Sequence, residues 1–208
     1  MEFSLRDYRP EDEASWLRCR VLSFLGTPYY DNVLPAKPAM AAPGCSLVAA
    51  DADVNADVDA DAGGQGSAGV VVGCLDLAVD GELATIETIA VHPDHQRRGI
   101  GRALLAEAAV RARAAGATTL DAWTRDQPES LAWYRATGFV ESDHYLHVFA
   151  DAYADEGEPG RAVERPGAGL NPIGVFSHAP LAREEEMRTR FRRVYVCRRF
   201  SQPLTPAG

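Results

Sequence analysis

Apolar residues that recur with a period of two, or that run on without polar interruption, predict β-strands in this 208-residue chain. Seven such runs are expected as strands: Phe3–Arg6, Ser46–Ala50, Val70–Val79, Leu83–Val91, Thr118–Trp123, Phe139–Phe149 and Phe191–Phe200. Asp80-Gly81 separates the third run from the fourth, and this dipeptide favours a tight hairpin turn. Six strands are therefore expected before residue 150, and the seventh arrives late.

Apolar residues at helical spacing predict helices between the strands. A first helix opens at Pro10, which acidic residues follow, and it ends before Gly26. Three more helices are expected over Ile100–Ala115, Glu129–Thr137 and Ala182–Arg190, and glycine follows the first two of these. This order of elements predicts a mixed α/β fold with helices on both faces of one central sheet.

Residues 51–69 and residues 150–175 show neither pattern. Residues 51–69 read DADVNADVDADAGGQGSAG, which predicts a flexible acidic loop. A calcium loop of the EF-hand type is not expected, because the positions that need glycine and glutamate hold Ala56 and Ala62. Residues 150–190 form a long insertion before the last strand. Within it, Asn171–His178 is apolar and aromatic and is expected to be ordered.

Composition argues against several classes of protein. The chain has 21 basic and 30 acidic residues and a net charge of −9, so a nonspecific nucleic-acid binder is not expected. No apolar run is long enough to span a bilayer and no secretory signal is visible, so we expect a cytoplasmic protein without a membrane partner. The four cysteines are far apart in the sequence, so neither a metal centre nor a disulfide is expected.

The strongest chemical signal lies between the fourth strand and the helix that follows it. Residues Ile89–Arg102 read IAVHPDHQRRGIGR, so a strand runs into a short polar turn and a helix begins at once. A helix N-terminus presents unpaired N–H groups and partial positive charge. Gly99 and Gly101 allow a bulky anion to approach the backbone, and three arginines add positive charge. The turn therefore predicts a binding site for a diphosphate.

Gln96–Gly101 resembles the Q/R-x-x-G-x-G/A signature of the GNAT family of N-acetyltransferases, which holds the diphosphate of coenzyme A. Trp133–Phe139 is similar to the Y-x-x-x-G-F motif of the same family. A Rossmann nucleotide site is the weaker reading, because its G-x-G-x-x-G pattern is absent from the turn. The resemblance implies a single GNAT domain over residues 1–208. Its central sheet is expected to be twisted and mostly antiparallel, with six to seven strands and helices on both faces.

The resemblance also implies that acetyl-CoA is the co-substrate and that no metal is needed. It places the pantetheine arm along the fourth strand, like an added strand, and the diphosphate in the glycine turn. Gln127 stands where the family often has asparagine, so an amide is kept at that position. The expected coenzyme-binding residues are Ile89, Ala90, Val91, Gln96, Arg97, Arg98, Gly99, Ile100, Gly101, Arg102, Gln127 and Tyr134.

Two residues are expected to act in a direct transfer of the acetyl group to an amine. Tyr134 aligns with the family tyrosine that protonates the departing thiolate, and packing against the sheet is its alternative role. Glu87 is the leading candidate for the base that deprotonates the amine, because a carboxylate within an apolar strand would be partly desolvated. A half-exposed glutamate or a partner of an arginine is the alternative. His144 and His147 are the runners-up for the base.

The acceptor is expected to be a primary amine of a small molecule. In the family fold, the first helix, the loop after it and the last strands rim the acceptor side. The aromatic residues expected there are Trp16, Tyr29, Tyr30 and Tyr145, with Phe176 and His178 as weaker candidates. Part of residues 150–190 is expected to cover this site.

Alternatives to this reading stay open. The chain could instead acetylate protein lysines or N-termini, or bind coenzyme A as a regulatory module without catalysis. The arginine-rich end, Arg183–Arg199, is expected to contain a solvated, charged helix, and a homodimer contact through the last strand is the alternative.

Overall fold

The computed structural model describes most of the chain, namely residues 3–51, 69–163, 166–167 and 169–204. It confirms the expected class, because strands and helices are mixed and most neighbouring strands are antiparallel. Most of the predicted acidic loop, residues 52–68, lies outside the described residues.

The chain divides into two compact units, each of which is described by itself. Unit 1 comprises Met1–Ala122 and Ser201–Gly208, and unit 2 comprises Trp123–Phe200. The expectation of one GNAT domain over residues 1–208 stays a prediction.

Unit 1 is built on strands that the apolar pattern predicted to within two residues at each end. They are β1 (Phe3–Asp7), β2 (Cys45–Asp51), β3 (Val70–Asp80), β4 (Leu83–Val91) and β5 (Thr119–Arg125), of which β5 ends in unit 2. Their order is β1-β2-β3-β4-β5. Strands β1 to β4 pair antiparallel with one another, and β4 pairs with β5 in parallel.

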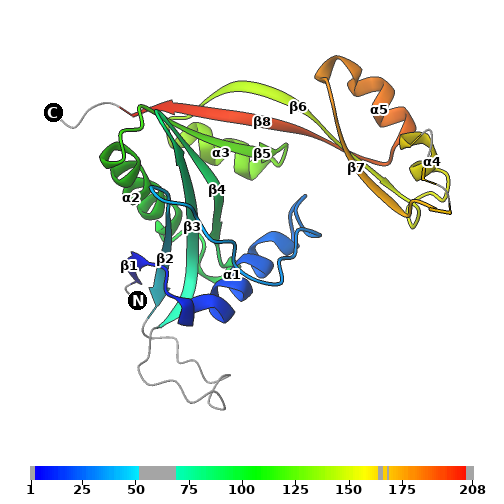
Figure 1. The fold of residues 1–208 in the computed structure, drawn as a ribbon. Helices are drawn as coiled ribbons and strands as arrows, with labels where there is room; N and C mark the ends of the chain where they lie inside the picture. The colour runs from blue at the N-terminus through cyan, green and yellow to red at the C-terminus, as the bar shows by residue number, and fades with distance from the viewer. Residues whose placement is uncertain (1–2, 52–68, 164–165, 168, 205–208) are drawn as a thin grey trace, which may run out of the picture. The chain divides into compact units, whose positions relative to one another are not determined.

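The helices of unit 1 are α1 (Glu13–Leu25), after the short 3-10 turn η1 (Pro10–Asp12), and α2 (Ile100–Ala114), after η2 (Pro93–His95). Figure 1 shows α1 and α2 on opposite sides of β2, β3 and β4. The helix expected from Pro10 thus begins as a 3-10 turn. Behind it, the buried Asp12 accepts hydrogen bonds at 2.6 and 2.7 Å from the guanidinium of Arg6.

Small side chains let these helices approach the sheet closely. A Cβ atom at Gly73 of β3 would lie 2.6 Å from Cγ2 of Ile100, so glycine is needed for α2 to pack at this distance. On the other face, α1 contributes to a core of buried residues consisting of Trp16, Cys19, Val48, Val71, Cys74 and Ala90. The packing of unit 1 therefore depends on both faces of β3.

Two buried basic side chains hold the segment between α1 and β2. Arg20 donates a hydrogen bond at 2.6 Å to the backbone oxygen of Asn32. Nζ of Lys37 lies 3.0 Å from Oδ1 of Asp76 on β3, and each of these side chains is only 4% exposed. Lys37 also donates to Oγ of Ser46 at 2.8 Å. A buried charge pair thus ties this long connection to the sheet.

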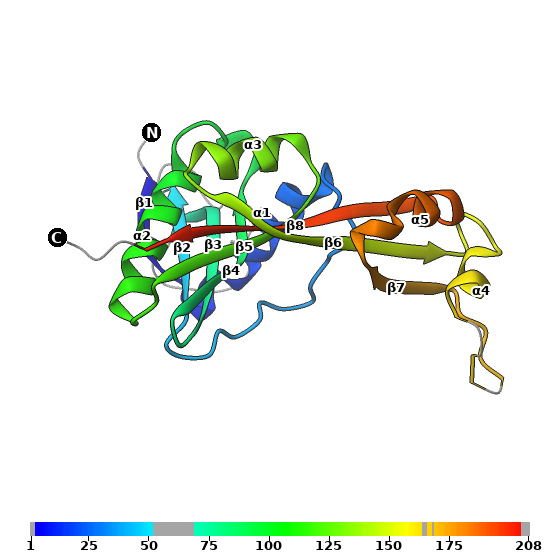
Figure 2. The ribbon, with the colours of Figure 1, turned by 90° about the horizontal axis from the view of Figure 1, so that it is seen from above.

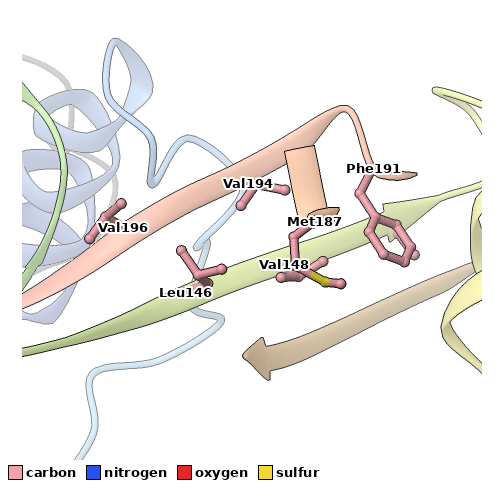
Figure 3. Packing of buried hydrophobic residues seen from close by; sticks show 7 residues of the cluster. Leu146, Val148, Met187, Phe191, Val194 and Val196 are labelled. Carbon is pink, nitrogen blue, oxygen red and sulfur yellow. The ribbon is translucent and has the colours of Figure 1, made fainter. Parts of the chain in front are cut away.

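Unit 2 continues with short helices and long strands. Its elements are α3 (Pro128–Ala136), β6 (Val140–Asp151), α4 (Glu158–Ala162), β7 (Gly174–Ala179), the 3-10 turn η3 (Leu181–Arg183), α5 (Glu184–Arg190) and β8 (Arg193–Pro203), whose last residues belong to unit 1. Figure 2 shows β8, β6 and β7 side by side, in that order. One face of these strands buries apolar side chains (Figure 3), among them Leu146, Val148, Met187, Phe191, Val194 and Val196.

The described strands number eight rather than the six to seven expected, because the insertion over residues 150–190 contains β7 and also the helix α4. Both elements are too short to show a clear period. A buried carboxylate organises the region instead. Glu158 is 1% exposed and accepts hydrogen bonds from the backbone N–H groups of Asp151 at 3.0 Å and Arg192 at 2.6 Å. Such a polar anchor leaves no signal in a hydrophobic pattern.

Candidate active site

The turn between β4 and α2 has the backbone geometry of an anion site. Gly99 is the N-cap of α2 with φ +82°, and no side chain caps this end of the helix. A Cβ at Gly99 would find no other atom within 4 Å, so the space beside this residue is open. Arg97 also has a left-handed backbone, with φ +62°. The turn therefore directs N–H groups of the first helical turn towards open space.

The three arginines of this turn differ in exposure and in their partners. Arg97 and Arg102 are exposed. Arg98 is instead held by the buried carboxylate of Asp51, at 3.4 Å, and by the ring of His95, at 2.6 Å. Asp51 and His95 were not singled out from the sequence, because Asp51 belongs there to an acidic, low-complexity stretch. The solvent-exposed positive charges of the turn thus belong to Arg97 and Arg102.

Strand β4 brings its C-terminal half to this turn. Within unit 1, the parallel pairing of β4 with β5 runs from Leu83–Thr119 to Ile86–Ala122. Nε2 of Gln96 donates a hydrogen bond at 3.3 Å to the backbone oxygen of Val91, which joins the turn to the end of the strand. Ile89, Ala90 and Val91, predicted to hold the pantetheine arm, form this end of β4 and pair with Leu75, Cys74 and Gly73 of β3.

Glu87 does not have the surroundings expected for it. In the β3–β4 register, Asp76 faces Thr88 and Leu77 faces Ile86, so Glu87 is the extra residue of a β-bulge. Its side chain is exposed. The expectation of a partly desolvated carboxylate is therefore wrong, because the bulge breaks the alternation on which it was based.

In unit 2, the aromatic neighbours of Tyr134 hold its ring. The residue lies on α3 and is 5% exposed. Its ring stacks on Phe200 at 5.3 Å between centroids and meets Phe139 edge-on at 5.4 Å. Gln127 is the half-buried N-cap residue of the same helix. The helix therefore begins at one predicted coenzyme-binding residue and carries another.

A cluster of rings surrounds Tyr145 on the face of β6 and β7 opposite the buried apolar side chains. The ring of Tyr145 lies 4.6 Å from that of His178 and 5.1 Å from that of His147. Tyr145 and His178 line an open hollow of about 340 Å³ together with Ala179 and Pro180. Phe176, 52% exposed, stacks beside them on Phe149. Tyr145, expected at the acceptor side, thus lines a shallow, open depression of the surface.

His147 is poorly suited to act as the base. Burial, followed by the charge of Arg125 and by His178, lowers the pKa of His147 to about 4. Nε of Arg125 donates to its Nδ1 at 3.2 Å, so the neutral ring carries its proton on Nε2 and donates it to Oη of Tyr145 at 3.2 Å. The other candidate, His144, is exposed.

The aromatic residues expected around the acceptor in unit 1 differ in exposure. Trp16 is fully buried in the core, so its expected contact with the acceptor is not supported. Helical spacing alone does not separate a core tryptophan from a binding one. Tyr29 is half-buried against Phe24, with centroids 5.5 Å apart, and Tyr30 is 50% exposed.

The described part of the chain contains no group of three or more histidine, cysteine or acidic side chains arranged to hold a metal. None of its helices has the length and apolar character that a bilayer crossing needs. All four cysteines are free.

Comparison with known proteins matches residues 54–141 to the model of the acetyltransferase (GNAT) domain. No curated protein matches the chain. Among solved structures, the ribosomal-protein-S18-alanine N-acetyltransferase of Escherichia coli has a TM-score of 0.56 at 16% identity, over 100% of this chain and 97% of that one. The putative acetyltransferase yncA of Salmonella typhimurium, solved with its cofactor acetyl-CoA, has 0.54 at 16%, over the same shares. Nourseothricin acetyltransferase has 0.52 at 16%, over 99% and 100%.

Proposed function

We propose that the chain, whose residues 54–141 match the GNAT acetyltransferase domain, is an acetyl-CoA-dependent acetyltransferase that moves the acetyl group directly to a primary amine of a small molecule. The observation that carries the donor side is the open, glycine-capped N-terminus of α2 beside the end of β4. The chemistry of a diphosphate fits this place, because uncapped N–H groups and the exposed Arg97 and Arg102 complement its charge. Ile89, Ala90 and Val91 would hold the pantetheine arm.

Gly99→Ala tests the donor site. Alanine fits the space but not the left-handed backbone, so the turn should relax and coenzyme A should bind about tenfold more weakly by calorimetry. Gly116, after the other end of α2, is the matched control, because it has φ +92° and equally open space. Gly116→Ala should strain the backbone to a similar degree and leave the affinity for coenzyme A unchanged. Equal affinities of the two variants would count against the site.

The chain's own residues would then move two protons. When bound, acetyl-CoA supplies the thioester that the amine attacks, so that a C–N bond forms and the C–S bond breaks. Tyr134 would donate its hydroxyl proton to the departing thiolate. Glu87, exposed at the bulge, would accept the amine proton through water. Deprotonating a lysine-like amine at pH 7 costs about 4–5 kcal/mol, so a nearby base that accepts this proton would speed the reaction.

The hollow beside Tyr145 supports a small acceptor. It is open, with a volume of about 340 Å³. Its walls are the rings of Tyr145 and His178, which suit the face of a flat or cationic group. Acetylation of a protein lysine or N-terminus is the competing reading.

A panel of acceptors distinguishes these functions. Free thiol released from acetyl-CoA would be measured with aliphatic amines, aromatic amines, aminoglycosides and lysine-containing peptides. We expect turnover with one class of small amine and none with the peptides. Turnover with peptides alone would establish the protein acetyltransferase. Tight coenzyme binding without turnover on any amine would establish a regulatory module and overturn the proposal.

A further inference from the structure

Asp51, the last residue of β2, places a buried carboxylate beside the turn that precedes α2. The side chain is 0% exposed. Its Oδ2 lies 3.4 Å from Nη2 of Arg98 and 3.7 Å from Nδ1 of His95. Nη1 of Arg98 lies 2.6 Å from the same nitrogen of His95. We call these three side chains the Asp51 cluster.

The Asp51 cluster brackets the strained part of the turn. His95 and Arg98 stand on either side of Arg97, whose φ of +62° is unfavourable for a residue with a Cβ atom. Gly99, with φ +82°, follows at once. Two side chains anchored on β2 can hold such a backbone, because each fixes one end of it.

We propose that Asp51 is a positioning residue for coenzyme binding, which holds Arg98 and His95 so that the turn keeps its anion-binding shape. This inference rests on the proposed donor site. Arg98 then anchors the turn, because its charge is matched by a buried carboxylate. Arg97 and Arg102, both exposed, would supply the charge that meets the diphosphate.

The Asp51 cluster also depends on the protonation state of His95. Because a guanidinium only donates, Nδ1 of His95 accepts from Arg98 and the ring is neutral. The groups that face the ring are Asp51 from β2, Arg98 from the turn, and His92 and Asp94 at η2. Burial, followed by Arg98 and His92, lowers the pKa of His95. Protonation would remove the acceptor and place a second positive charge beside Arg98, so coenzyme affinity should fall as the pH drops below 6.5.

Asp51→Asn tests the proposal, since it removes the charge and keeps the shape. We expect the Kd for coenzyme A and the KM for acetyl-CoA to rise about tenfold, with kcat at saturating donor nearly unchanged. Asp12→Asn is the matched control, because Asp12 is also buried and paired with an arginine, Arg6. Both variants should lower the denaturation midpoint, but only Asp51→Asn should weaken the binding of coenzyme A.

Two further variants separate the roles within the cluster. Arg98→Gln should weaken coenzyme binding as much as Asp51→Asn does. Coenzyme binding that is unchanged or tighter in Asp51→Asn, but weaker in Arg98→Gln, would make Arg98 a direct diphosphate ligand and overturn the proposal. Equal weakening by Asp51→Asn and Asp12→Asn would reduce Asp51 to a stabilising residue and also overturn it.

His95→Asn keeps an acceptor atom that does not titrate, so the loss of affinity at acid pH should disappear. If the loss of affinity at acid pH persists in this variant, the protonation of His95 is not its cause. The unaltered protein is measured first. If it fails to bind coenzyme A, the proposed donor site itself is wrong. If it binds coenzyme A and Asp51→Asn binds equally well, the donor site stands and only the role proposed for Asp51 is wrong.

Discussion

Replacing Tyr134 by phenylalanine is expected to lower kcat about 10²–10⁴-fold, because the phenol is the proposed acid for the departing thiolate. The Kd for coenzyme A should stay nearly the same. The aromatic ring is kept, so its stacking on Phe200 and its edge contact with Phe139 are preserved. Steady-state kinetics with the amine found in the acceptor panel, together with calorimetry, measure the two effects separately.

Tyr195→Phe is the matched control for this experiment. Tyr195 lies on β8 of the same unit, and its hydroxyl accepts a hydrogen bond at 3.3 Å from Nε of Arg193. Loss of that hydroxyl should leave kcat within about twofold, since a single half-buried hydrogen bond contributes little. A Tyr134→Phe variant that turns over as fast as the Tyr195→Phe variant would remove Tyr134 from the mechanism.

Lys37→Met is expected to destabilise the protein by about 3–5 kcal/mol, since it leaves the carboxylate of Asp76 buried without its partner. Both side chains are 4% exposed, so water does not replace the lost charge. The connection between α1 and β2 also loses its tie to Ser46. Urea denaturation followed by fluorescence and circular dichroism measures the change.

The double variant Lys37→Met/Asp76→Leu should recover most of the lost stability, because no unpaired charge stays behind. Arg111→Met is the control for an exposed pair. Arg111 lies 2.7 Å from Glu107 on the surface of α2, and its loss should hardly move the denaturation midpoint. If Lys37→Met were as mild as Arg111→Met, the buried pair would not hold this connection.

Most of the fold up to residue 149 could be predicted because each element has its own local pattern. Strand β4 and helix α2 show their periods over nine and fifteen residues, and both were located to within one residue. The glycine turn before α2, our predicted donor site, was located in the chain for the same reason. A strand end, two glycines and a helix start are adjacent in sequence, so Gly99 and Gly101 could be assigned without knowledge of distant residues.

Predictions of how deeply a side chain is buried, and against what, were wrong at two positions. Glu87 was expected to be desolvated, but a bulge exposes it. Trp16 was expected near the acceptor, but it fills the core between α1 and the sheet. Helical or strand spacing gives the direction of a side chain only while the geometry stays regular, and it does not say what packs against that side chain.

The order of apolar and polar residues alone determined the mixed α/β class and the main strands and helices of the first 149 residues, and the glycines located the turn between β4 and α2. Only the tertiary structure decided that Asp51 holds Arg98, that Lys37 pairs with Asp76, and that Glu158 organises an insertion containing β7. The physical reason is the separation along the chain of the residues that interact. Periodicity and turn chemistry act between near neighbours in the chain, whereas a buried charge finds its partner across elements that only folding brings together.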